Sequence, residues 1–146
     1  MDSALLLPDP HDDDAAPFWA GAARGELLVQ TCVDCSARRM PPRPMCFACR
    51  SLAHTWQQLS GRGTIWSFIV AHPPLLPAYQ ALAPYNVITV ASADDPSLRF
   101  VGNLVARADG PINEIDPASI RIGEPVVVVF QPEGDLFLPR WRRAPS

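Results

Sequence analysis

The chain has 146 residues, of which 48% are hydrophobic and 18% charged, and its net charge is −3. This length and composition suit one medium-sized domain, or a domain with a small appendage, and exclude a largely disordered chain. The sequence has no lysine, so all twelve basic residues are arginine, and its acidic balance argues against binding nucleic acid or other polyanions by overall charge.

The apolar segments do not indicate membrane insertion or secretion. The longest runs, "TIWSFIVA" and "VVVVF", are far shorter than a membrane span needs. The N-terminal stretch "MDSALLLPDPHDDD" lacks the basic start and long apolar run of a secretory signal. We therefore expect a cytoplasmic protein without a membrane partner, whose thiols stay reduced.

Residues 1–25 are predicted to form an acidic arm followed by a short helix. Asp13 or Asp14 is suited to cap a helix that runs through "AAPFWAGAAR". Pro17 fits the first turn of that helix, and Gly25 is suited to end it.

Phe18 and Trp19 are the large apolar residues of this predicted helix. A helix of this length does not fold alone, so these side chains need a surface to pack on. Two interpretations stay open: packing against the chain's own body, or docking on another protein. The following stretch, "ELLVQT", is predicted to be a strand that leads into the first cysteine pair.

Residues 26–55 contain all four cysteines, as two Cys-x-x-Cys pairs within "CVDCSARRMPPRPMCFAC". Reduced thiols at this spacing are typical of a four-coordinate zinc site, because each Cys-x-x-Cys turn directs two sulfurs to one ion. Since the protein fills every position, the predicted Zn²⁺ would be structural. Four thiolates would also suit iron. The predicted ligands are Cys32, Cys35, Cys46 and Cys49.

Other interpretations of the cysteine pairs remain open. They are two disulfides, a redox pair, or a ribbon that no longer holds a metal. Zinc knuckles often have glycine directly after the second cysteine, whereas Ser36 and Arg50 occupy those positions here.

Residues 56–146 are rich in predicted strands, so the chain is predicted to be mainly β. One short helical turn is expected in "DPASIRIGEP", and "HPPLLPAYQALAP" is expected to be a loop. Short strands in this number favour a small closed barrel, with the OB-fold as the leading candidate. The predicted strands are "TWQQLS", "GRGTIWSFIVA", "YNVITVAS", "LRFVGNLVA", "VVVVFQ" and "LFLPRW".

The sequence shows no catalytic constellation. Its three histidines, His11, His54 and His72, form no recognisable metal or nucleophile motif. There is no Gly-x-Ser-x-Gly elbow, phosphate loop or dinucleotide fingerprint. If the cysteines bind a metal, no thiol is left as a nucleophile. We therefore expect a protein that is not an enzyme by itself.

Arginines concentrate in the ribbon and in the C-terminal tail. The ribbon contains Arg38, Arg39, Arg43 and Arg50 against only Asp34, and the tail contains Arg140, Arg142 and Arg143 beside Trp141. Guanidinium groups pair well with phosphates and carboxylates, so these clusters suit a nucleotide phosphate, a nucleic-acid backbone or an acidic partner. Solvated surface arginines are the alternative interpretation.

A barrel with a zinc ribbon raises the alternative of single-stranded nucleic-acid binding, which needs aromatic residues in a basic groove. Trp66 and Phe68 are expected to share one face of their strand, with Phe100 near them. The basic residues lie mostly outside the barrel strands, which makes nucleic acid the less favoured partner.

The order of these motifs resembles the family catalogued as domain of unknown function thirty-five, which joins a rubredoxin-like zinc ribbon to an OB-fold. The resemblance covers nearly the whole chain, and its members have an N-terminal helical segment, then the ribbon, then the barrel. The matching stretches are "FWAGAARGELLVQTCVDC", "PPRPMCFACRS", "SGRGTIWSFIVAHPP", "APYNVITV", "NLV", "IRIGEPVVVVF" and "LPRWRRA".

This resemblance implies a non-catalytic accessory subunit of a thiolase-fold acyl-CoA enzyme, in lipid, steroid or aromatic degradation. The implied partner is a thiolase or a lipid-transfer-protein-like aldolase, in some cases with a hot-dog-fold hydratase, and acyl-CoA would bind at the shared site. The residues expected at the partner or acyl-CoA surface are Phe18, Trp19, Arg38, Arg39, Arg43, Trp141 and Arg142.

Overall fold

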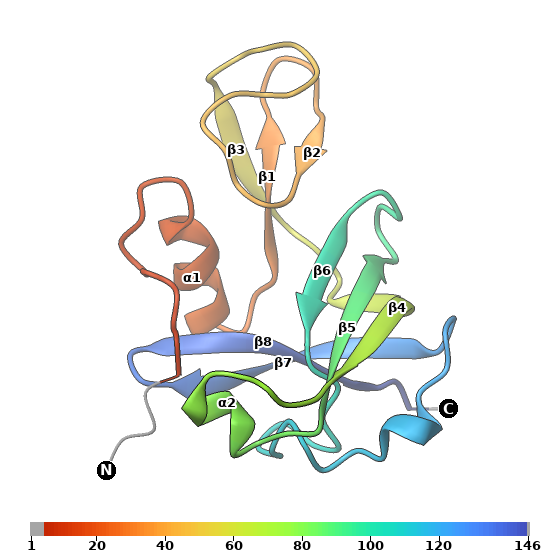
Figure 1. Cartoon of the computed structure of the whole chain (residues 1–146). Helices are drawn as coiled ribbons and strands as arrows, with labels where there is room; N and C mark the ends of the chain where they lie inside the picture. Colours follow the sequence, from red (N-terminus) through yellow and green to blue (C-terminus); the bar gives the residue numbers. More distant parts are fainter. Residues whose placement is uncertain (1–4, 146) are drawn as a thin grey trace.

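The computed structural model describes residues 5–145, so the first four residues of the predicted acidic arm, and Ser146, lie outside it. The described part is mostly β, as predicted, with two sheets whose paired strands are antiparallel. Figure 1 shows the smaller sheet standing above the larger one. The elements are α1 (Ala16–Ala23), β1 (Leu28–Cys32), β2 (Arg38–Arg39), β3 (His54–Gln58), β4 (Arg62–Ala71), α2 (Pro77–Gln80), β5 (Tyr85–Ser92), β6 (Arg99–Gly102), the 3₁₀ turn η1 (Pro117–Ser119), β7 (Pro125–Glu133) and β8 (Leu136–Arg143).

The larger sheet, in the order β6-β5-β4-β7-β8, curls into a nearly closed barrel. Its two ends meet where the residues after β6 run beside β8. There the N–H of Trp141 donates to the carbonyl of Asn103 at 3.0 Å, and the N–H of Val105 donates to the carbonyl of Trp141 at 2.7 Å. These bonds satisfy backbone groups that an open sheet edge would leave unpaired. The predicted small barrel is confirmed.

Trp141 fills the barrel interior at this closing seam. Its side chain is 1% exposed and packs against Phe100, with ring centroids 6.2 Å apart. A Cβ at Gly102 would lie 3.1 Å from the indole, so any side chain there would require the indole to shift by a few tenths of an ångström. The expectation that Trp141 lies on a partner surface is therefore wrong, because the closed barrel buries it.

The smaller sheet, in the order β2-β1-β3, forms the ribbon. All five residues of β3 pair with β1. The strand predicted in "TWQQLS" is present, but it belongs to the ribbon sheet and crosses the boundary expected between residues 55 and 56. The short strand β2 was not predicted. The division into segments 1–25, 26–55 and 56–146 stays a prediction.

The helix α1 begins one turn after Asp12, whose side chain accepts hydrogen bonds from the N–H groups of Asp14 and Ala15, at 3.0 and 3.1 Å. The side chain that serves the helix start is thus that of Asp12, and the prediction of Asp13 or Asp14 as the cap is wrong. Gly25 ends the helix with φ of 78°, as predicted.

Phe18 is 7% exposed and belongs to the main hydrophobic core, and the half-buried Trp19 packs against the same core. Their rings meet edge to face with centroids 5.0 Å apart. For Phe18 the structure therefore selects packing against the chain's own body, which corrects its placement on a partner surface. Trp19 keeps an accessible part.

A β-bulge in β4 separates the two aromatic residues expected to share one face. The pairing register of β4 with β5 shifts between Ile65 and Ser67. As a result Trp66 points outward, 55% exposed and covered by the guanidinium of Arg99 at 4.5 Å, while Phe68 packs against the core. Phe100 is buried too, so these aromatics form no row for stacking bases.

The loop predicted in "HPPLLPAYQALAP" contains the short helix α2, which the sequence did not indicate. It lies under the barrel in Figure 1. Among the helices of residues 5–145, none combines the length and the apolar character that a membrane crossing requires.

Replacing Trp141 by alanine should lower the free energy of unfolding by about 3–5 kcal/mol, because it empties the core at the seam. Urea unfolding followed by circular dichroism measures this. Phe137→Ala is the control, since Phe137 lies on the same strand but is 37% exposed and should cost about 1 kcal/mol or less. Equal, small losses in both variants would contradict the assignment of Trp141 to the core.

Candidate metal centre and candidate partner surface

The two cysteine turns have the same backbone geometry. The N–H of Ser36 donates to the carbonyl of Cys32 at 3.0 Å, and the N–H of Arg50 donates to the carbonyl of Cys46 at 2.9 Å. Ser36 and Arg50 both have positive φ angles, of 64° and 67°. These are the positions where glycine is common in such turns, and the structure shows the backbone conformation that favours it.

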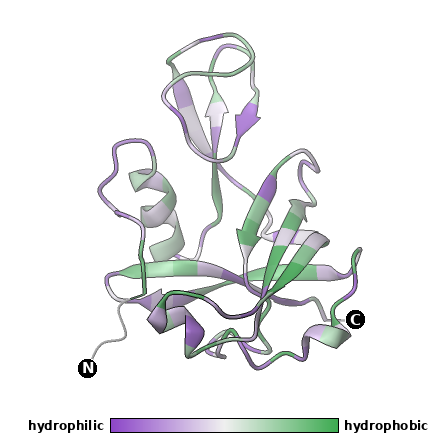
Figure 2. Ribbon diagram, viewed as in Figure 1, coloured by the Kyte–Doolittle hydropathy of each residue, from purple (hydrophilic) through white to green (hydrophobic). Residues whose placement is uncertain are grey.

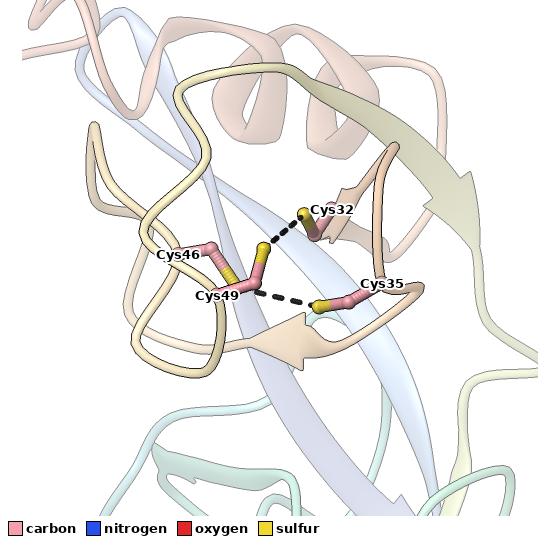
Figure 3. A group of neighbouring side chains, drawn as sticks. All are labelled: Cys32, Cys35, Cys46 and Cys49. Carbon is pink, nitrogen blue, oxygen red and sulfur yellow. Dashed lines mark hydrogen bonds between the residues drawn. The ribbon is translucent and has the colours of Figure 1, made fainter.

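The four thiols converge on one point (Figure 3). Their sulfur atoms all lie within 4.8 Å of one another. The Sγ atoms of Cys32 and Cys49 are 3.6 Å apart, as are those of Cys35 and Cys46. Four sulfurs at about 2.3 Å from a central ion would be separated by about 3.8 Å, so the arrangement fits one tetrahedral metal ion. All four cysteines are free, with no disulfide among the described residues.

Backbone N–H groups lower the pKa of two of these thiols. The N–H of Cys49 is the main cause that lowers the pKa of Cys46 to about 6, against the opposing effect of burial. The N–H of Cys35 is likewise the main cause that lowers the pKa of Cys32. A lowered pKa favours the thiolate, which is the form that binds a metal. Against the backbone hydrogen bonds of Ala37 and Ser51, burial and the neighbouring cysteine thiols raise the pKa values of Cys35 and Cys49.

The groove beside the metal centre contains three of the four ribbon arginines. It is about 260 Å³ in volume and lies between the ribbon and the 97–98 segment of the barrel domain. Apolar side chains form the rest of its wall, and Phe47 stands at its edge with 73% exposure. The residues that line it are Arg38, Arg39, Met40, Pro41, Arg43, Met45, Phe47, Ser97 and Leu98.

Gln30 and Arg39 hold the loop after β2 from both sides. The N–H of Arg43 donates to Gln30 Oε1 at 2.8 Å, and Arg39 donates to the carbonyl of Arg43 from Nε and Nη2 at 3.2 and 3.0 Å. Arg39 is 4% exposed, so it supports the groove surface from beneath. The expectation that Arg39 itself lies on the surface is therefore wrong. The Nη1 of Arg39 and the Nε2 of Gln30 are buried donors with no acceptor among the described residues.

The groove is positively charged. Its lining has three arginines and no carboxylate. The carboxylate of Asp95 lies near the groove but does not line it. Its pKa is lowered mainly by a hydrogen bond from Ser97, and in part by the positive charge of Arg38. The groove can therefore accept a phosphate or a carboxylate group, with an apolar or aromatic group against Phe47 and Met45.

The expected surface residues do not form one site. Arg38, Arg39 and Arg43 are brought together at the groove, while Phe18, Trp19 and Trp141 meet in or against the core. Arg142 lies on β8, half-buried. Sequence reasoning missed Gln30, Met45 and Phe47. The structure shows that the residue after the first cysteine of each knuckle, Val33 or Phe47, is exposed.

Comparisons with known families match both parts of the chain. The model described as the ChsH2 rubredoxin-like zinc ribbon domain matches residues 19–55. The model described as the ChsH2 C-terminal OB-fold domain matches residues 56–131. Together they cover the ribbon and most of the barrel, in the order seen in the structure.

Two curated relatives are similar in sequence to this chain. The chain is 36% identical over 141 residues to a probable enoyl-CoA hydratase alpha subunit of Thermomonospora curvata, which covers 95% of this chain and 40% of the relative. The chain thus spans about two fifths of that subunit's length. It is 30% identical over 109 residues to a DUF35 domain-containing scaffold protein of Methanothermobacter thermautotrophicus, covering 74% of each.

Among solved structures, a chain of the Ltp2-ChsH2(DUF35) aldolase superposes with a TM-score of 0.79 and 33% sequence identity. The match covers 94% of this chain and 100% of that chain. The similarity therefore extends over the helix, the ribbon and the barrel together.

Replacing Cys46 by serine should abolish metal binding and disorder the ribbon, because a hydroxyl is a poor substitute for a thiolate ligand. The barrel should remain folded, since its core lies elsewhere. Metal content by inductively coupled plasma mass spectrometry and barrel unfolding by circular dichroism measure the two effects. Leu52→Ala, at an exposed ribbon position, is the control and should keep its metal. Full metal loading of the Cys46 variant would contradict the assignment.

Replacing Arg50 by glycine should stabilise the ribbon by about 1 kcal/mol, because its positive φ strains any residue with a side chain. The midpoint of chelator-induced metal release should rise accordingly. Ser51→Gly is the adjacent control, since it lies outside the left-handed region, and should bring no gain. Destabilisation by Arg50→Gly would show that its side chain does more for the knuckle than its backbone strain costs.

Proposed function

The chain belongs to the ChsH2 family of zinc ribbon and OB-fold proteins, also known as DUF35, and we propose that it is a non-catalytic accessory subunit of a thiolase-fold acyl-CoA enzyme. In this role the partner supplies the reacting groups. The chain stabilises the partner and helps to form or bridge the acyl-CoA site. The proposed context is lipid, steroid or aromatic degradation.

One observation carries this proposal: the similarity to a chain of the Ltp2-ChsH2(DUF35) aldolase over 100% of that chain's length. A match of this extent means that the whole of that chain has its counterpart here. The DUF35 scaffold protein of Methanothermobacter thermautotrophicus supports a role in assembly in the same way. A thiolase-type aldolase is therefore the proposed partner class.

The name of the Thermomonospora curvata relative, a hydratase alpha subunit, supports a second partner of the hydratase type. Because the match covers 40% of that subunit, the unmatched part of the relative is a candidate source of the hydratase activity in that protein. We propose that an aldolase and a hydratase act on successive intermediates, and that this chain links them.

We propose that the metal is zinc and that it is structural. Four protein sulfurs fill a tetrahedral shell and leave no position for water or substrate. The ion would supply folding free energy to the ribbon, while Cys32, Cys35, Cys46 and Cys49 hold it.

The groove lined by Arg38, Arg39 and Arg43 is the proposed surface for the partner or for the phosphates of acyl-CoA. The charges of Arg38 and Arg43, the lack of a lining carboxylate and the exposed Phe47 support this assignment, while Arg39 holds the groove loop from beneath. Aromatic and arginine side chains are the types most often essential at protein interfaces. Trp19, near the N-terminus, and Arg142, near the C-terminus, remain further candidates for the partner or acyl-CoA surface.

The proposal predicts a defined complex. The tagged chain, purified from its host after nuclease treatment, should carry a thiolase-fold or hydratase-fold protein at a ratio near one to one, identified by mass spectrometry. Reconstitution from the purified components, measured by sedimentation velocity, should give the same assembly. Recovery of nucleic-acid-processing proteins that are lost upon nuclease treatment would contradict the proposal and favour strand binding.

In that reconstituted complex, Phe47→Ser and Arg43→Gln should each weaken assembly or acyl-CoA affinity by about tenfold. Arg62→Gln is the matched control, because Arg62 is an exposed arginine on β4 outside the groove. If the two groove variants behaved like the control in both measurements, the groove assignment would be wrong while the accessory role could still hold.

A further inference from the structure

A second pocket lies on the outside of the barrel wall, beneath the N-terminal arm and α2. It consists of two adjoining hollows of about 500 and 470 Å³ that share Leu5, Ile112 and Arg140. This size is in the range of small-molecule pockets. Its walls are mainly apolar, with contributions from Leu82, Pro111, Val87, Val101 and Leu138.

Arg140 of β8 is the one arginine that lines both hollows. Neutral amides hold its guanidinium: Nη1 donates to Asn103 Oδ1 at 2.6 Å, and Nε donates to Gln131 Oε1 at 3.2 Å. Its Nη2 makes no hydrogen bond to any residue of the 5–145 range that the structure describes. One end of the guanidinium is therefore available to a ligand.

The two amides are themselves fixed by buried hydrogen bonds. Asn103 donates from Nδ2 to the carbonyl of Asn86, and Gln131 donates from Nε2 to the carbonyl of Gly110 at 2.7 Å. Asn103 and Gln131 are 8% and 7% exposed. A network of this kind orients Arg140 before any ligand arrives, which lowers the entropy lost on binding.

Arg140 also lacks a carboxylate at ion-pairing distance among the described residues. Burial lowers its pKa from the usual value, against the weaker opposing charge of Glu133 on the pocket wall. A guanidinium nevertheless stays protonated in proteins. Two carboxylates, those of Asp109 and Glu133, line the same hollow, and Asp109 is paired with Arg107 at 3.1 Å. Within residues 5–145 the partly desolvated charge of Arg140 has no such partner, and its natural complement is an anion.

We propose that this pocket binds a small amphipathic anion, with its carboxylate or phosphate monoester on Arg140 and its apolar body between α2 and the barrel wall. The anion would take the free end of the guanidinium through charge-assisted hydrogen bonds. The apolar body would cover Leu82, Ile112 and Leu138. The pocket is separate from the ribbon groove, so this inference does not depend on the accessory function.

Titration calorimetry on the purified full chain tests the proposal with three probes: decanoate, decyl phosphate and methyl decanoate. At least one of the two anions should bind, and the uncharged methyl ester should bind about tenfold more weakly or worse, because it cannot pair with the guanidinium. The stronger of the two anions identifies the head group. Equal binding of ester and acid, or no binding of either anion, would overturn the proposal.

Variants locate the binding. Arg140→Gln should weaken anion binding by about tenfold or more, whereas Arg62→Gln, which changes the charge equally at an exposed position, should not. Leu82→Trp, which fills the hollow without touching the guanidinium network, should also reduce binding and keeps the test valid if Arg140→Gln unfolds. If Arg140→Gln is folded and binds the anion with unchanged affinity, or if Leu82→Trp binds it with unchanged affinity, the assignment is overturned.

Discussion

The convergence of four sulfur atoms is the constraint on which the upper half of this molecule depends. Between residues 33 and 53 the only buried side chains are those of Arg39 and Cys46, so this segment has no hydrophobic core of its own. The part of the ribbon next to the barrel is different, because Leu27, Val29 and Leu59 belong to the main hydrophobic core. The ribbon is therefore fixed to the barrel at one end and depends on the cysteine cluster at the other. Figure 2 agrees, with hydrophobic colour concentrated on the barrel strands and hydrophilic colour prominent on β2.

The candidate partner surface depends on that cluster in turn. The loop from Met40 to Met45 joins the two knuckles and is held by Gln30 and Arg39, so its shape follows from the positions of Cys35 and Cys46. Loss of the metal would leave the three arginines and Phe47 without a fixed arrangement. A structural ion at this centre would thereby support the candidate partner surface without taking part in chemistry. The barrel supplies the rigid support for this ribbon.

Local signals in the sequence were sufficient for much of the fold. The Cys-x-x-Cys spacing, the glycine at the end of α1 and the short strand segments of the barrel each act over a few residues, and the four-cysteine ribbon, the helix end and the barrel that they predicted are confirmed. The wrong cap of α1 is a local error of two residues at most, whereas the errors at Trp141 and Trp66 come from how the strands pair. Trp141 is buried only because β8 meets the residues after β6, and Trp66 turns outward only because β4 contains a bulge. The orientation of Arg140 also depends on a distant partner, because its Nη1 donates to Asn103 on the other side of the barrel seam.

Hydrogen exchange with mass spectrometry on the full chain, before and after removal of the metal by a chelator, tests the central claim most directly. The account predicts that residues 33–53 lose their protection when the metal is removed, while the barrel strands β4, β5, β7 and β8 keep theirs. Retained protection in residues 33–53 without metal would contradict the claim that the four-sulfur centre gives the ribbon its shape. A loss of protection throughout the barrel would equally contradict it, because the barrel core is independent of that centre.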